Sequence, residues 1–283
     1  MTKPLLYESH CHTPLCKHAV GDPVEYASVA AARGLKGIVF TCHCPLPDGI
    51  SASVRMSPEQ YERYVELVAA ARAEFAGRVD VRLGLESDYF PGTETWLEKL
   101  HARHPLHHVL GSVHMQVPEY RARYFTGDWF DYQQTYFRHL AESAETGLFD
   151  TLAHPDLVKN ESPVDWHFAR IQPFIERALD RIAATGVAME LNTSGLHKAI
   201  REINPSPTML GLMRARGIPV VLGSDAHSPQ RVGADYVGAL RTLQSVGYTE
   251  VSFFLERKRQ TVALAAALAS LPPVGHRHPT PTV

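Results

Sequence analysis

Short apolar runs rich in β-branched residues alternate along this chain with longer segments of helical periodicity. Strands that alternate with helices predict a parallel sheet, because each helix returns the chain to the edge where the next strand starts. The pattern therefore places the chain in the α/β class. The expected strands are 5–9, 37–41, 79–85, 108–113, 149–153, 187–191 and 220–224, with a weaker eighth at 251–255.

Proline, glycine and small polar residues mark where helices begin and end. Asp22-Pro23 is expected to open a helix that Gly34 closes, since aspartate caps the first turn and glycine suits the residue past the end. Ser57-Pro58-Glu59-Gln60 has the form of a capping box and predicts a helix toward Phe75. The other expected helices are 131–146, 165–184, 206–217 and 261–271.

The composition is that of a soluble globular protein. With 283 residues, 45% of them hydrophobic and 20% charged, the chain is not mainly disordered. A net charge of −2 gives no electrostatic case for a nucleic acid or a membrane surface as partner. No apolar run reaches the ~18 residues of a membrane span. Four cysteines are too few for a disulfide scaffold, which favours reduced thiols and a cytoplasmic location.

No low-complexity linker divides the chain, so we expect a single domain over residues 1–270. The segment 271–283 holds four prolines and Gly275, and is expected to be a disordered tail because proline does not support regular structure. His276 and His278 lie in that tail and are interpreted as solvated.

Residues of metal-ligand type stand at the carboxyl ends of seven consecutive expected strands, 28 to 43 residues apart. Each step is about one strand–helix unit. In a (β/α) barrel the carboxyl ends of all strands converge on one face, where active sites lie. Imidazole and carboxylate both bind transition metals, so the pattern predicts a metal site. The residues are His10 with His12, His43, Glu86, His114, His154, Glu190 with Asn192, and Asp225 with His227.

Single members of this set are weak signals in a chain with 16 histidines. His10 and His12 can chelate one ion because alternate residues of an extended strand point the same way, but such a pair also arises by chance. Six further histidines are interpreted as surface or capping residues: 101, 104, 107, 108, 139 and 167. The four cysteines, Cys11, Cys16, Cys42 and Cys44, are interpreted as buried small side chains rather than as a thiolate zinc site.

Six stretches carry the ligand candidates in order: SHCHTPLCKHA at 9–19, GLESDYFPG at 84–92, GSVH at 111–114, FDTLAHPDLVK at 149–159, ELNTSGL at 190–196 and GSDAH at 223–227. In these stretches the chain resembles the PHP (polymerase and histidinol phosphatase) superfamily of metal-dependent phosphoesterases, and most of all its histidinol-phosphatase branch. The resemblance extends to about Arg259.

The resemblance implies a distorted (β/α)7 TIM-like barrel that holds three divalent metal ions. Glu86 is expected to bridge the first and second ions, and Glu86, Asp225 and His227 are assigned to catalysis through the ions they hold. The implied ligands are His10, His12, Glu86 and Asp225 for the first ion, Glu86, His114 and His154 for the second, and His18, His43 and His227 for the third. Ligation rich in histidine suits Zn, Fe or Mn better than Mg.

The remaining site residues are expected to serve the substrate or the ligands. Lys159, Lys198 and Arg201 follow strand ends and could bind phosphate, as could Arg55 in an expected active-site loop, 45–56; each could equally be a solvated charge. Glu190 and Asn192 are expected to orient ligands or to be satisfied polar groups of the barrel.

The leading hypothesis is a histidinol-phosphate phosphatase of histidine biosynthesis. Ions in such a site neutralise the phosphate and generate hydroxide at neutral pH, which would attack phosphorus directly, without a phosphoenzyme. One alternative is a phosphoesterase for a nucleotide or another small phosphate ester, and another is a catalytically silent metal-binding module. The substrate is expected to be a small phosphate monoester, with no nucleic-acid or membrane partner. The oligomeric state is left open.

Overall fold

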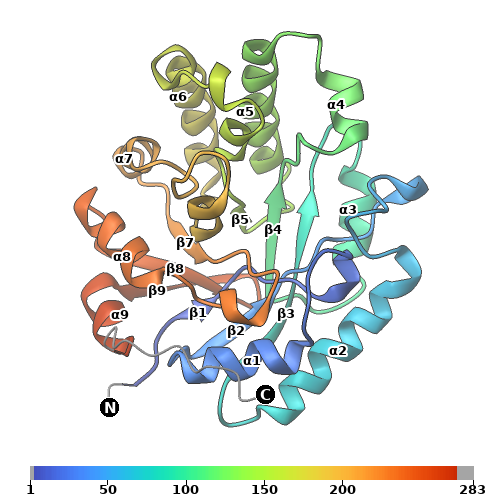
Figure 1. The fold of residues 1–283 in the computed structure, drawn as a ribbon, viewed down its shortest axis with the longest axis vertical. Coiled ribbons are helices and arrows are strands. Elements are labelled where there is room, and N and C mark those ends of the chain that lie inside the picture. The colour runs from blue at the N-terminus through green and yellow to red at the C-terminus, as the bar shows by residue number, and fades with distance from the viewer. Residues whose placement is uncertain (1–2, 273–283) are drawn as a thin grey trace.

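The sheet follows the order of the chain. Within residues 3–272, the part that the computed structural model describes, nine strands form one sheet in the order β1 to β9 (Figure 1). Neighbours from β1 to β8 are parallel, and β9 pairs with β8 in antiparallel register. The strands are β1 Tyr7–Glu8, β2 Gly37–Phe40, β3 Asp80–Asp88, β4 His108–Ser112, β5 Thr151–Leu152, β6 Ala188–Asn192, β7 Val220–Gly223, β8 Glu250–Leu255 and β9 Lys258–Ala263.

Helices connect the successive strands from β1 to β8 and lie around the sheet (Figure 1). The expected capping box of Ser57 with Gln60 is present before α2, and Asp22, the expected cap of α1, forms a second box with Glu25. The helices are α1 Pro23–Ala32, α2 Tyr61–Glu74, α3 Glu94–His101, α4 Pro118–Tyr124, α5 Trp129–Glu145, α6 Phe168–Thr185, α7 Pro207–Ala215, α8 Tyr236–Ser245 and α9 Leu264–Ser270. Among the described residues, none of these helices has both the length and the apolar character that crossing a membrane requires.

The first and seventh strands meet beyond their carboxyl ends and close the barrel there. The backbone N–H of His12 donates to the carbonyl of Ala226 at 3.0 Å, and the N–H of Ala226 donates to the carbonyl of His10 at 3.1 Å. Seven parallel strands thus enclose the interior, which confirms the predicted (β/α)7 barrel. Polar residues that follow these strands are brought to one mouth.

The end of the chain differs from the expectation. Residues 261–263 belong to β9, and the helix expected over 261–271 is the shorter α9. Glu256 and Arg257 join β8 to β9 with φ of 53° and 59°, the left-handed conformation of a two-residue hairpin turn. Neither residue is glycine or asparagine, so the sequence carries no turn signal. The predicted tail lies outside the described residues from 273 onward, including His276 and His278.

Candidate metal centre

The predicted ligands come together at the barrel mouth. His10 and His12 follow β1, and Cys11 between them pairs with Ala226. His43 follows β2 and forms an isolated bridge with Glu86 of β3. His114, His154 and Asp225 follow β4, β5 and β7 in the same way. Strand ends separated by most of the chain therefore supply one cluster.

Glu86 lies at the centre of this cluster, with its two oxygens facing different imidazoles. Its Oε2 is 2.8 Å from His43 Nδ1, 3.4 Å from His10 Nε2 and 3.7 Å from His12 Nε2. Its Oε1 is 3.1 Å from His154 Nε2 and 3.3 Å from His114 Nε2. A carboxylate that presents one oxygen to each of two groups of imidazoles has the form of a bridging ligand.

Asp225 joins the group at Oε2 of Glu86. Asp225 Oδ1 lies 3.1 Å from His12 Nε2 and 3.6 Å from His10 Nε2. Its φ is 50°, and that of His154 is 29°, values unusual for residues other than glycine. Such backbone strain costs of order 1–3 kcal/mol at each residue and clusters at functional sites. Eight non-glycine residues among the described ones have positive φ, and Asp225 and His154 are two of them.

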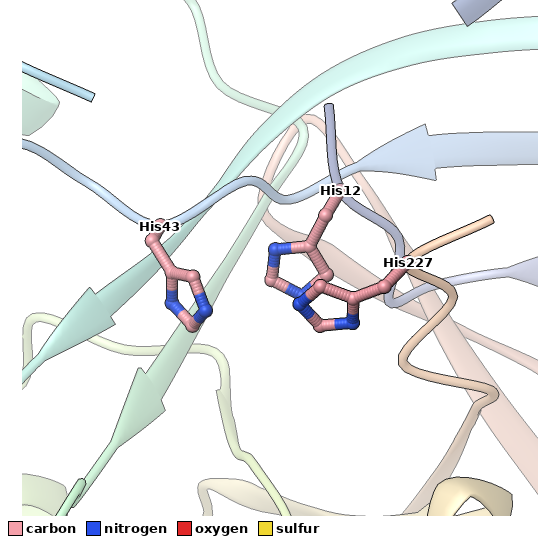
Figure 2. Close-up of side chains that lie close together, drawn as sticks. All are labelled: His12, His43 and His227. Atoms are coloured by element: carbon pink, nitrogen blue, oxygen red, sulfur yellow. The ribbon is translucent and has the colours of Figure 1, made fainter. Parts of the chain in front are cut away.

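His43 also belongs to a separate set of imidazoles, with His18 and His227, on the solvent side of the cluster. The ring of His227 stacks on that of His12, with centroids 3.9 Å apart, and lies 4.5 Å from the ring of His18. The His18 and His43 centroids are 5.4 Å apart. Figure 2 shows His12, His43 and His227 directed toward one another from three separate segments.

Several polar atoms of the cluster have no hydrogen-bond partner among residues 3–272 although they are buried. They are His10 Nε2, His12 Nδ1, His43 Nδ1, His154 Nδ1, His227 Nε2 and Glu86 Oε2. His43 Nδ1 and Glu86 Oε2 lie 2.8 Å apart but are not aligned as a hydrogen bond. Buried polar groups in native proteins are nearly always satisfied, by protein, water or an ion. Nitrogen and carboxylate donors left over in this way fit divalent transition metals.

The charges of the cluster also suit a cation. Burial would raise the pKa of Glu86, but the imidazoles of His10 and His114 outweigh it and hold the pKa well below its usual range. Burial would also raise the pKa of Asp225, but His10 and His12 hold this pKa well below its usual range. Burial lowers the pKa of His43 to about 3, which keeps this imidazole neutral and able to bind a metal.

Glu190 and Asn192 lie behind the cluster. Glu190 Oε1 is 2.7 Å from His10 Nδ1, while Oε2 accepts hydrogen bonds from the backbone N–H of His154 at 2.8 Å and the amide of Asn192 at 3.0 Å. The carboxylate fits here only because residue 223 is glycine: a Cβ there would lie 1.8 Å from Glu190 Oε1.

Asp88 is a site residue that the sequence analysis did not single out. Its Oδ1 lies 2.9 Å from His114 Nδ1. The available signal was its position: Asp88 is two residues beyond Glu86 in β3, so both side chains project to the same face.

A pocket of about 360 Å³ opens above the cluster, and the four predicted phosphate contacts relate to it differently. Lys198 lines it, with Nζ 3.9 Å from Asp225 Oδ2. Arg55 lines it too, but forms an ion pair with Asp88. Arg201 is exposed and is absent from the described lining.

The structure contradicts the prediction that Lys159 binds phosphate. Its ammonium is fully buried and donates to Asp156 Oδ2 at 2.9 Å, Glu202 Oε2 at 3.0 Å and the carbonyl of Ile203 at 2.8 Å. An ammonium has three protons, so these bonds leave none for a phosphate.

Two histidines are more deeply buried than expected, and one buried cysteine has polar contacts. His108 and His139, expected at the surface, are buried, with His108 Nε2 2.9 Å from Thr151 Oγ1 and His139 Nδ1 2.7 Å from the hydroxyl of Tyr120. All four cysteines are buried and unpaired, as expected. Cys16 contacts more than apolar groups: hydrogen bonds with Cys42 and with nearby imidazoles lower its pKa.

Comparison with known proteins gives a consistent result. The family model described as PHP domain matches residues 8–194. A protein of Deinococcus radiodurans named probable histidinol-phosphatase is 40% identical over 257 residues, covering 88% of this chain and 96% of its own. The histidinol-phosphatase of Bacillus subtilis is 27% identical, covering 81% and 96%.

Solved structures share the fold. The crystal structure of histidinol phosphate phosphatase from Lactococcus lactis, complexed with zinc, L-histidinol and phosphate, superimposes with a TM-score of 0.73 at 20% identity. The superposition covers 92% of this chain and the whole of the Lactococcus lactis chain. A histidinol phosphatase structure from Listeria monocytogenes gives a TM-score of 0.72, also at 20% identity, over 82% of this chain and 99% of its own.

Proposed function

This chain belongs to the PHP domain family, and we propose that it is a histidinol-phosphatase, which hydrolyses L-histidinol phosphate to L-histidinol and phosphate. The observation that carries the reaction class is the position of Glu86, whose two oxygens face two groups of imidazoles at the base of the pocket. The substrate rests on the relative that is 40% identical over nearly its whole length and is named for this activity.

We base the ligand set of each ion at the barrel mouth on the family resemblance. The contacts of Glu86 with His10, His12, His114 and His154 support the first two sets. Divalent ions bound there, Zn, Fe or Mn, neutralise phosphate charge and make water nucleophilic at neutral pH. In our proposal the first ion is held by His10, His12, Glu86 and Asp225, the second by Glu86, His114 and His154, and the third by His18, His43 and His227.

Other side chains would orient the ligands and the substrate. Glu190 accepts from His10 Nδ1 and thereby directs His10 Nε2 toward Glu86 and Asp225. Lys198 places an ammonium in the pocket wall, where it can bind phosphoryl oxygens as a point charge. We further propose that the protein acts in the cytoplasm on this small molecule.

Assay of the purified protein tests the proposal. Phosphate release is measured from L-histidinol phosphate beside a panel of nucleotides, with and without a chelator, after metal reconstitution. Rapid, chelator-sensitive release from histidinol phosphate alone is the expected result. Chelator-sensitive release from nucleotides instead would keep the metal chemistry and change the substrate. No release from any ester would favour a catalytically silent module.

A further inference from the structure

Arg55 reaches the metal centre from the loop 45–56, which lies between β2 and α2. Its side chain is only 2% exposed. One terminal nitrogen, Nη2, donates to Asp88 Oδ2 at 2.6 Å, and the other, Nη1, donates to the carbonyl of Cys44 at 3.0 Å. Both terminal nitrogens of the guanidinium are thus engaged by protein acceptors.

Asp88 contacts His114 as well as Arg55. The oxygen that Arg55 leaves free, Oδ1, lies 2.9 Å from His114 Nδ1. The opposite ring nitrogen, Nε2, lies 3.3 Å from Glu86 Oε1. Three side chains from a loop, β3 and the end of β4 therefore form one continuous row that ends at the bridging carboxylate.

Each contact in this row has a physical consequence. A buried carboxylate stays ionised only when it is paired, and Arg55 supplies the pairing charge for Asp88. The ionised carboxylate accepts a hydrogen bond from His114 Nδ1–H, which fixes the ring so that Nε2 lies on the side of Glu86, where it can bind an ion. Removing Arg55 leaves Asp88 buried without its cation and frees the His114 ring to change tautomer or rotate.

We propose that Arg55 is a positioning residue for the metal centre, acting through Asp88 on His114, rather than a phosphate contact. Since Arg55 belongs to the loop that walls the pocket, the same loop conformation that shapes the pocket orients a metal ligand. The inference rests on the proposed function insofar as His114 binds one of the ions.

The loop has other attachments, which makes a matched control possible. The backbone N–H of Ser51 donates to Glu119 Oε1 at 3.1 Å, and the indole N–H of Trp96 donates to the carbonyl of Pro45 at 2.9 Å. Glu119→Ala removes one attachment of the loop without touching Asp88. It separates an effect of loop position in general from an effect of Arg55 on Asp88.

The test measures metal retention. Wild type, Arg55→Met, Arg55→Lys, Asp88→Asn, Glu119→Ala and the double variant Arg55→Met/Asp88→Asn are loaded with zinc. Bound zinc is counted by elemental analysis, and its affinity is measured by competition with a chromogenic chelator. Circular dichroism checks folding, and Arg55→Lys keeps the charge if Arg55→Met does not fold.

We expect Arg55→Met to weaken binding of one ion about 10–100-fold, the range for loss of a residue that supports a metal ligand. Arg55→Lys is expected to fall between wild type and Arg55→Met, and Glu119→Ala to bind zinc like wild type. The double variant is expected to bind zinc about as well as Asp88→Asn, because residues acting through one contact are not additive.

Two results would overturn the inference. One is unchanged zinc affinity in Arg55→Met with a raised KM for the phosphate ester, which would make Arg55 a substrate contact. The other is equal zinc loss in Glu119→Ala, which would assign the effect to the loop as a whole. The metal measurement uses no substrate. A wild type that binds zinc but does not hydrolyse histidinol phosphate would therefore refute the proposed function and leave this inference standing.

Discussion

Glu190 Oε1 lies 2.7 Å from Nδ1 of His10, and both side chains are fully buried. The same carboxylate accepts from the backbone N–H of His154, so one residue of β6 supports predicted ligands that follow β1 and β5. Because His10 Nδ1 is occupied by this contact, only its Nε2 can face the centre of the cluster.

Substitution of Glu190 tests this support. We expect Glu190→Ala to lower metal affinity or activity about 10–100-fold, because the His10 ring loses its fixed tautomer and orientation. Glu190→Gln keeps an acceptor of the same size and is expected to lose less. The measurements are zinc affinity and kcat. An alanine variant indistinguishable from wild type in both would contradict a role for Glu190 in orienting His10.

Substitution of Glu86 is expected to reduce activity more than substitution of any other ligand. Glu86→Ala should reduce phosphatase activity by orders of magnitude and release more than one ion per chain, because its two oxygens face both groups of imidazoles. Circular dichroism should still show the barrel. Retained turnover in this variant would count heavily against the bridged cluster.

Lys159 and Lys198 were both predicted to bind phosphate, but substituting them is expected to change different properties of the protein. Lys159→Met should lower the free energy of unfolding by about 3–5 kcal/mol, because it leaves the buried Asp156 carboxylate without its cation. Urea denaturation measures this change. A variant as stable as wild type would mean that Asp156 takes up a proton at little cost.

Lys198→Ala is expected to act on the substrate instead. Lys198 lines the pocket, so its loss should raise KM for the phosphate ester, by about tenfold or more for a charged hydrogen bond. Arg201→Ala should change KM little, since Arg201 is exposed and is not among the residues that line the described pocket. Equal effects of the two substitutions would contradict this assignment.

The fold was predictable because its signals are local and repeated. Each strand is a short apolar run, and each ligand candidate follows one, so the closure of the barrel alone brings His10, Glu86 and Asp225 together. The β8–β9 hairpin was missed because Glu256 and Arg257 adopt left-handed φ values without the glycine that usually announces them.

The roles of the basic residues at the site were harder to predict from the sequence, for a different reason. Whether a basic side chain binds substrate or protein depends on partners distant in the sequence: Glu202 for Lys159 and Asp88 for Arg55. Neither pairing leaves a trace in local spacing. Asp88, by contrast, could have been found, because it shares a strand face with Glu86.

Metal removal should change how the stability of the protein depends on pH. In the metal-free protein, burial alone would lower the pKa of His114, but Asp88 and Glu86 outweigh it and raise the pKa to about 10 from an ordinary value of 6.5. A raised pKa means that the protonated form stabilises the fold. That contribution is complete below pH 6.5 and is lost as the pH rises toward 10.

Glu86 and Asp225 affect stability only at acid pH. Their pKa values are depressed, so the stability they contribute is lost only as the pH falls below the ordinary values of 4.5 and 3.8. The chelated protein should therefore lose stability between pH 6.5 and 9. The zinc-loaded protein should gain stability or hold level over that range, because metal binding requires deprotonated imidazole. Tm measured at several pH values, with and without chelator, checks this. Parallel curves would mean that the histidines of the cluster do not bind the metal.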